Sequence, residues 1–308
     1  MKLTVHGKSA YAYTGGRPFD PALPCIAFVH GALHDHSAWT LLARWFAHHG
    51  YSVLAVDLPG HSQSEGPPLT SVEATADWLL ALFDAAGVAR AAVAGHSMGS
   101  LIALEVAARA PERISHLVMI GTAYPMKVSD ALLTTAREQP LKAIDMVNAF
   151  SISTHAAKPS YPGPGMWLHG SNRALMRRTL HAGGVTAEGM NLFEHDFRVC
   201  DRYAGGLEAA ARVRCPVSLV LGRSDQMTSP RVTKDLAAAL KAKVVMLDSG
   251  HHLMAEQPDE LLAAMRAAPG RGRGRVTRGS RARARIRPPP PGPRARRRTP
   301  TRRCCPPP

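Results

Sequence analysis

The sequence predicts an α/β fold in which a mostly parallel central sheet carries helices on both faces. Short apolar runs alternate with longer helical patterns between Cys25 and Gly121, a rhythm that is typical of βαβ units. The apolar runs lack the polar alternation of half-exposed strands, as expected for parallel strands covered on both sides. A chain of 308 residues can also bury the sizeable core that such a domain needs.

The elements follow one another in a regular order. Strands are expected at 25–30, 52–56, 91–94, 116–121, 216–222 and 243–247, and helices between the first four at 39–48, 72–86 and 98–109. Residues 11–14 and the segment before them are expected to form an antiparallel hairpin at the sheet edge. The alternation stops near Tyr124 and resumes near Val213. Between these points helices are expected at 129–139, 141–151, 172–181 and 207–213, with a Pro/Gly/Ser-rich loop at 157–165.

The run Gly95–Gly99 places Ser97 between two glycines, where an apolar strand passes directly into a helical pattern. This is the G-x-S-x-G motif in the strand–turn–helix context that gives it meaning. Flanking glycines permit a sharp turn, and the helix N-terminus favours a developing negative charge. Ser97 is therefore a candidate acyl-transfer nucleophile, the alternative being a tight strand–helix turn without chemistry.

Two further residues could activate this serine. Asp225 follows the predicted strand at 216–222, and His251 follows the next strand, so the chain order is Ser97, Asp225, His251. His251 would accept the serine proton, and Asp225 would orient the imidazole. Asp225 has a competing interpretation as a helix N-cap before residues 228–230. His252 competes with His251, and is expected to be a loop residue or to face the inserted segment.

These motifs resemble the α/β-hydrolase family, in particular its capped lipase- and esterase-like members. The resemblance covers about the first 265 residues and rests on five blocks in order. They are 29–31 with Trp39 after it, 56–64, 95–99, 222–225, and 250–251 followed by Glu256 and Pro258. Ser62 stands where the family usually has glycine, in a loop of structural importance. The resemblance implies a core of residues 1–123 and 213–268, with a helical cap of residues 124–212 inserted after the sixth strand.

The resemblance also implies an oxyanion hole made by the backbone N–H groups of Ala32 and Met98. His30 is expected to brace the oxyanion loop and stands among the candidate pocket residues. The cap would line the rest of the pocket, and its candidates could equally form the cap's own small core. They are Met166, Trp167, Met190, Leu192, Phe193 and Phe197.

The expected function is hydrolysis of a carboxylic ester of a small, apolar substrate through an acyl-enzyme, without a cofactor. The same triad could serve an amide, a thioester, a carbon–carbon bond, acyl transfer or perhydrolysis, and the scaffold could instead be a non-catalytic ligand receptor. No metal is expected. The best histidine cluster, at 34–36, lacks a further ligand at a recognised metal spacing.

The last forty residues, 269–308, contain fourteen arginines and no lysine or acidic residue, so the formal charge of +15 belongs almost entirely to them. Disorder is expected there. Two interpretations stay open: an arginine-rich arm for nucleic acid or an anionic surface, and a shifted reading frame, which is favoured. Cysteine spacing without a disulfide framework, and the lack of a signal or membrane-spanning run, favour a cytoplasmic protein. Its partner would be a small-molecule substrate, with no membrane, and the oligomeric state stays open.

Overall fold

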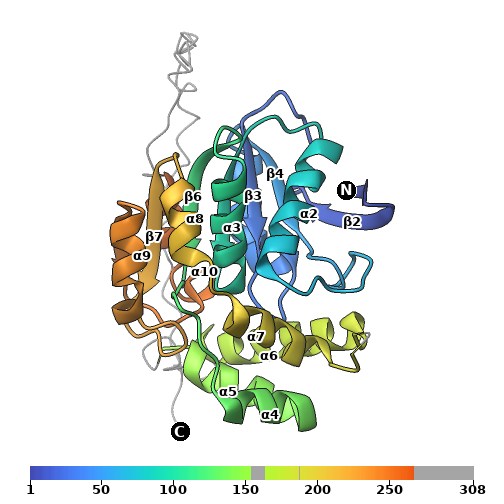
Figure 1. The fold of residues 1–308 in the computed structure, drawn as a ribbon, viewed down its shortest axis with the longest axis vertical. Helices are drawn as coiled ribbons and strands as arrows, with labels where there is room; N and C mark the ends of the chain where they lie inside the picture. The colour runs from blue at the N-terminus through green and yellow to red at the C-terminus, as the bar shows by residue number, and fades with distance from the viewer. Residues whose placement is uncertain (154–163, 187, 267–308) are drawn as a thin grey trace, which may run out of the picture. The chain divides into compact units, whose positions relative to one another are not determined.

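A computed structural model describes residues 1–153, 164–186 and 188–266, and these contain an eight-stranded sheet in the order β1-β2-β4-β3-β5-β6-β7-β8 (Figure 1). The edge strands β1 and β2 pair antiparallel, as does β2 with β4, whereas the other neighbouring strands are parallel. The predicted hairpin and mostly parallel sheet are confirmed. The strands are β1 Lys2–Val5, β2 Lys8–Tyr13, β3 Cys25–Val29, β4 Ser52–Val56, β5 Ala91–His96, β6 Ile114–Ile120, β7 Val217–Gly222 and β8 Lys243–Leu247.

Helices cover both faces of the sheet, and each face has its own apolar core. One core packs the sheet against helices α2 (Val72–Ala85), α3 (Met98–Arg109), α8 (Gly206–Arg212) and α9 (Lys234–Ala239). The other packs it against α1 (Thr40–Ala47), α10 (Leu253–Glu256) and α11 (Pro258–Arg266). Because every residue of β3, β4 and β7 is buried, this double cover explains why their sequences are mainly apolar.

The cap helices follow β6 and lie at one end of the sheet, below it in Figure 1. They are α4 (Asp130–Glu138), α5 (Pro140–Ser151) and α6 (Pro164–Gly183). Helix α7 (Leu192–Arg202) packs against α4, α6 and the core helix α3, and so connects the cap helices to the core. Helix α8, which the sequence pattern assigned to the cap, packs against α3 and α9. Two single-turn helices, η1 (His36–Trp39) and η2 (Pro230–Thr233), complete the described elements.

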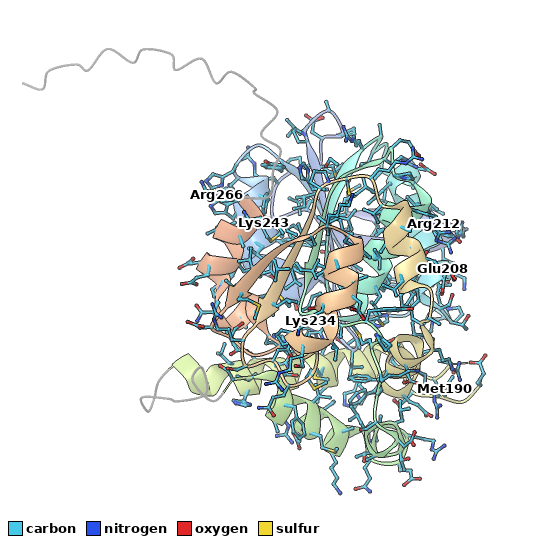
Figure 2. All side chains as sticks on the ribbon, turned by 60° about the vertical axis from the view of Figure 1, so that its left-hand side comes forward. Met190, Glu208, Arg212, Lys234, Lys243 and Arg266 are labelled. Carbon is cyan, nitrogen blue, oxygen red and sulfur yellow. The ribbon has the colours of Figure 1, made fainter. Side chains whose placement is uncertain are left out.

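Several sequence-based predictions concern segments outside the described residues. These are most of the loop expected at 157–165, of which only 164 and 165 are described, inside α6, and the whole of 269–308. Within the described part of the chain, Cys25, Cys200 and Cys215 are free thiols. No helix of that part has the length and apolar character that a bilayer crossing requires. Its charged side chains lie mostly outside the core, as Glu208, Arg212, Lys234 and Lys243 do (Figure 2).

Candidate active site

Ser97 lies at a strained turn between β5 and α3. Its backbone dihedral angles are φ 52° and ψ −120°, a left-handed conformation that non-glycine residues rarely adopt. The flanking glycines make this turn possible. A Cβ on Gly95 would collide with the carbonyl oxygen of Gly99, and one on Gly99 would collide with the carbonyl oxygen of Val29. The local sequence therefore holds Ser97 at the carboxyl edge of the sheet, at the N-terminus of a helix.

His251 and Asp225 come together at the same edge, beyond β8 and β7. The Nδ1 of His251 lies 2.9 Å from Oδ2 of Asp225, and both side chains are buried. The other oxygen, Oδ1, accepts hydrogen bonds from the backbone N–H groups of Met227 and Thr228, so Asp225 also caps the following turn. Asp225 is therefore a partner of His251 that also stabilises a turn, whereas the N-cap of the helix that follows is Ser229.

Thr228 was not singled out by the sequence, yet it contacts both members of this pair. Its hydroxyl donates to Oδ2 of Asp225 at 2.7 Å, and its Oγ1 lies 3.0 Å from Nδ1 of His251. Burial alone would raise the pKa of the Asp225 carboxyl. The facing His251 and the hydrogen bonds from Thr228 outweigh burial and hold that pKa below its ordinary value. Asp225 is therefore a carboxylate that can stabilise a positive charge on His251.

The backbone of His251 is fixed by contacts from two directions. Its N–H donates to the carbonyl oxygen of Ser151, the last residue of α5, at 2.6 Å. Its carbonyl accepts a hydrogen bond from Nε2 of His96 at 2.8 Å. Burial lowers the pKa of His96 well below its ordinary value, so His96 is a neutral donor here rather than a base.

A cavity of about 290 Å³ joins these groups to the cap. Ser97 and His251 line it on the core side, together with Gly31, Ala32 and Thr228. Its opposite wall is mainly apolar and consists of side chains from the segment after β6 and from α4, α5 and α7. Its apolar members are Met126, Val128, Leu132, Met146, Val147, Phe150 and Phe197, and the same segments also contribute Lys127, Ser129, Ser151 and Cys200. A pocket of this composition suits a small ligand with an apolar portion.

The loop expected to supply the oxyanion donors enters this cavity at Ala32. It is a tight turn in which the N–H of His34 donates to the carbonyl of Gly31 at 3.2 Å, with Leu33 in a left-handed conformation at φ 55°. The side chain of His30 supports this turn. Nδ1 of His30 donates to the carbonyl of Gly31, while Nε2 accepts from the N–H of Leu58. Met98, the other expected donor, is the first residue of α3 and directly follows Ser97.

The candidate pocket residues fall into three groups. Phe197 lines the cavity. The side chains of His30, Met190, Leu192 and Phe193 are not among its lining residues, and Phe193 is fully buried against Phe197. Leu192 and Phe193 are buried in the apolar core that also contains residues of the sheet, α2 and α3, and so they form neither the cavity wall nor a separate core of the cap. Met166 and Trp167 belong to α6, but their side chains lie outside the described residues.

A buried polar cluster beside the cavity was missed by sequence reasoning. The Nε2 of His34 lies 3.0 Å from Nε2 of His252 and 2.9 Å from Oδ1 of Asn172, whose amide nitrogen donates to Oδ1 of Asn148. Burial lowers the pKa of both histidines. His252 therefore turns toward the oxyanion loop rather than the solvent. These residues are far apart in sequence, so no local pattern could have grouped them.

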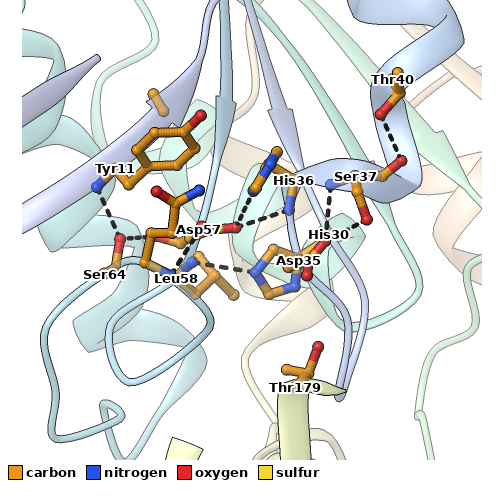
Figure 3. Close-up of polar contacts among 12 residues, drawn as sticks. Tyr11, His30, Asp35, His36, Ser37, Thr40, Asp57, Leu58, Ser64 and Thr179 are labelled. Atoms are coloured by element: carbon orange, nitrogen blue, oxygen red, sulfur yellow. Dashed lines mark hydrogen bonds and ion pairs between the residues drawn. The ribbon is translucent and has the colours of Figure 1, made fainter. Parts of the chain in front are cut away.

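A second histidine-containing cluster lies next to β4, where ligand atoms of Asp35, His36 and Asp57 lie within 4.8 Å of one another. Hydrogen bonds account for this proximity. Oδ1 of Asp57 accepts from both the backbone N–H and Nδ1 of His36 at 2.8 Å, and Asp35 accepts from Ser37 (Figure 3). Asp35 also accepts a hydrogen bond from Arg178 of α6. The cluster thus ties the start of η1 to β4 and to the cap, and its contacts are explained without an ion.

The chain is similar to known hydrolases over most of its length. The chain is similar to esterase Rv0045c of Mycobacterium tuberculosis, with 26% identity over 260 residues that cover 79% of this chain and 82% of the relative. It is also similar to esterase YbfF of Escherichia coli, with 26% identity over 279 residues and coverage of 86% and 98%.

Among solved structures, the enol-lactonase of Burkholderia xenovorans LB400 superposes with a TM-score of 0.73 at 22% identity, covering 86% of this chain and 98% of that one. At this identity the likeness concerns the fold. The model of the alpha/beta hydrolase fold family matches residues 24–258, which include Ser97, Asp225 and His251. The chain therefore belongs to the α/β-hydrolase fold family.

Proposed function

We propose that this α/β-hydrolase is a serine esterase that cleaves carboxylic esters with a small apolar acyl group. One observation carries the proposal: Ser97 on a strained turn and His251, hydrogen bonded to Asp225 at 2.9 Å, line the same cavity. A nucleophile, a base and an orienting carboxylate, which here follow β5, β8 and β7, are the requirements of acyl transfer. The two esterases that the chain resembles support the choice of an ester bond.

The mechanism follows from the roles that these groups can take. His251 removes the proton from the Ser97 hydroxyl as its oxygen attacks the ester carbonyl. The N–H groups of Ala32 and Met98 stabilise the negative oxygen of the tetrahedral intermediate. His251 returns its proton to the leaving alcohol, which leaves an acyl-enzyme. A water molecule then repeats the sequence, with His251 as base, and releases the acid and free Ser97.

The cavity limits the substrate that this mechanism can serve. Its volume of about 290 Å³ corresponds to roughly ten water molecules at their share of the liquid. Methionine, valine and phenylalanine side chains form most of its cap-side wall, so an apolar acyl group fits there better than a charged one. Short-chain esters are therefore the expected substrates, with lactones as cyclic members of the same class.

A fluorophosphonate probe tests the proposal because it reacts only with an activated serine. We expect the wild-type chain to be labelled and to hydrolyse short p-nitrophenyl esters, and Ser97→Ala and His251→Ala to lose both properties. Loss of a triad member costs on the order of 10⁴-fold or more in kcat. Ser71→Ala, at the N-cap of α2, serves as a matched control that keeps labelling.

Folded wild-type protein that is neither labelled nor active on esters, lactones and amides would overturn the proposal. Tight ligand binding without turnover would then favour a receptor built on this scaffold.

A further inference from the structure

Asp196 is a buried carboxylate outside the proposed triad, on the helix that connects the cap to the core. It belongs to α7, and its side chain is 1% exposed. Its Oδ2 accepts a hydrogen bond from the backbone N–H of Leu33 at 2.8 Å and lies 2.9 Å from Nε2 of His61. Its Oδ1 lies 3.1 Å from Nδ1 of His195. Such a carboxylate is retained inside a protein only where its contacts compensate its desolvation.

The contact with Leu33 reaches the candidate oxyanion loop. The peptide unit between Ala32 and Leu33 is held on both sides, since its N–H donates to Asp196 and its carbonyl accepts from Nδ1 of His34 at 2.7 Å. Leu33 has a φ of 55°, a left-handed conformation that is unfavourable for a residue with a Cβ. The turn is therefore not the intrinsic preference of its sequence, and outside contacts are needed to hold it.

His61 compensates the charge of Asp196. Its two ring nitrogens face two acceptors, Nε2 toward Asp196 and Nδ1 toward the carbonyl oxygen of Pro59 at 3.1 Å. A ring that donates at both nitrogens is an imidazolium. Asp196 therefore has a positive partner 2.9 Å away and presents a full negative charge to the N–H of Leu33, which makes a stronger acceptor than a neutral group would.

We propose that Asp196 is a positioning residue of the oxyanion hole, which fixes the turn at Ala32–Leu33 so that the Ala32 N–H faces the substrate oxyanion. This inference rests on the proposed esterase function. Asp196 does not line the cavity, so it acts on the reaction only through the loop. Because α7 also packs against α4 and α6, the same contact makes the oxyanion loop depend on the position of the cap.

Three variants test the proposal in the full-length chain. Asp196→Leu keeps a similar volume but accepts no hydrogen bond, whereas Asp196→Asn retains an amide oxygen for the Leu33 N–H. Glu194→Gln is the matched control, since Glu194 is a buried carboxylate of the same helix that pairs with Arg198 and lies away from the cavity. Circular dichroism and thermal unfolding establish that each variant is folded.

Kinetics on a p-nitrophenyl ester and inhibition by a trifluoromethyl ketone, which forms an oxyanion on Ser97, provide the readouts. Asp196→Leu is expected to lower kcat about 10- to 100-fold with little change in KM. It should also weaken binding of the ketone inhibitor by a similar factor. Asp196→Asn should lie between Asp196→Leu and the wild type, and Glu194→Gln should match the wild type. If Asp196→Leu does not fold, Asp196→Asn decides, with a parallel fall in kcat and ketone affinity required.

Three results would overturn the inference. An active wild type with unchanged kcat and ketone affinity in the folded Asp196 variants overturns this inference alone, as does an effect confined to KM. A wild type that neither reacts with a fluorophosphonate nor hydrolyses esters overturns the proposed function and this inference together.

Discussion

Thr228 stabilises the candidate catalytic pair through a single hydroxyl group. That hydroxyl donates to Oδ2 of Asp225 and lies beside Nδ1 of His251, so it fixes the carboxylate oxygen on which the histidine depends. We predict that Thr228→Val lowers kcat about 2- to 10-fold, the range that corresponds to one hydrogen bond. Thr228→Ser, which keeps the hydroxyl, should restore the rate. Steady-state kinetics on an ester would measure the difference, and equal rates for Thr228→Val and the wild type would contradict it.

Among single residues, the sequence predicts those candidate catalytic residues that belong to a motif or directly follow a strand. Ser97, Asp225 and His251 follow three strands, and the parallel sheet brings all of them to one edge. The neighbouring histidines show the limit of such reasoning. Sequence spacing favours His251 over His252, and the structure places His251 against Asp225 but turns His252 toward His34. Only tertiary packing determines the second contact, so no spacing rule reveals it.

Helix α7 is the longest of the helices that the sequence pattern fails to predict, which also include the short α9 and α10. Its buried face includes His195 and Asp196 beside Leu192 and Phe193, so charged residues interrupt the apolar periodicity that indicates a helix. The sequence nevertheless contains a signal for the start of this helix. Asn191 precedes the helix, its side chain accepts from the N–H of Glu194, and an N-cap residue followed three positions later by glutamate is typical of a helix start. The parallel strands, by contrast, have mainly apolar sequences, and the pattern predicts all of them.

The ion pair between His61 and Asp196 predicts a pH-dependent link between the core and α7. Burial opposes the charge of each side chain, but their mutual attraction and hydrogen bonds prevail, so the pKa of His61 is raised and that of Asp196 is lowered. The stability due to the raised His61 pKa is complete below about pH 6.5 and is lost as the pH rises through its folded pKa. The stability due to the lowered Asp196 pKa is present above about pH 4 and is lost as the pH falls through its folded pKa.

We therefore predict that the melting temperatures of the wild type and Asp196→Asn differ most between about pH 4 and 6.5, and that this difference shrinks toward pH 9. Neighbouring His30 does not supply the effect in that range, because burial, with the facing His61, lowers its pKa to about 4. Glu194→Gln removes an ion pair with an arginine, which stays protonated throughout, so its effect should stay constant from pH 6.5 to 9. Scanning calorimetry across this range checks both variants, and parallel curves for them would contradict the assignment.

For the whole molecule, the topology explains why residues from distant parts of the chain form one site. The turns after β3, β5, β7 and β8 open at the same edge of the parallel sheet, where the cap segment closes over them. Because this arrangement depends only on strand order and connection, the alternation of apolar runs and helices was enough to predict it. The cap wall depends on side-chain packing between α4, α5 and α7, which has no counterpart in local sequence.

The distribution of charge along the chain leads to a final prediction about residues 269–308. Removing the fourteen arginines of this segment leaves twenty-four basic against twenty-three acidic residues, so a chain ending at Ala268 has a formal charge of +1 instead of +15. The family match ends at residue 258, and every candidate catalytic residue lies before it. We expect the shortened chain to keep its kcat/KM within about twofold, since surface changes away from a site have small effects.

Binding to a DNA oligonucleotide separates the two interpretations of the segment. A basic arm must give affinity that falls steeply with salt and disappears in the shortened chain, because counterion release drives such binding. Lost ester hydrolysis in the shortened chain would instead show that these residues support the catalytic domain, contrary to the prediction. Unchanged hydrolysis together with salt-dependent DNA binding only in the full chain would assign the charge to a separate activity. The sequence of the gene's 3′ end then determines whether the segment is encoded in the native frame.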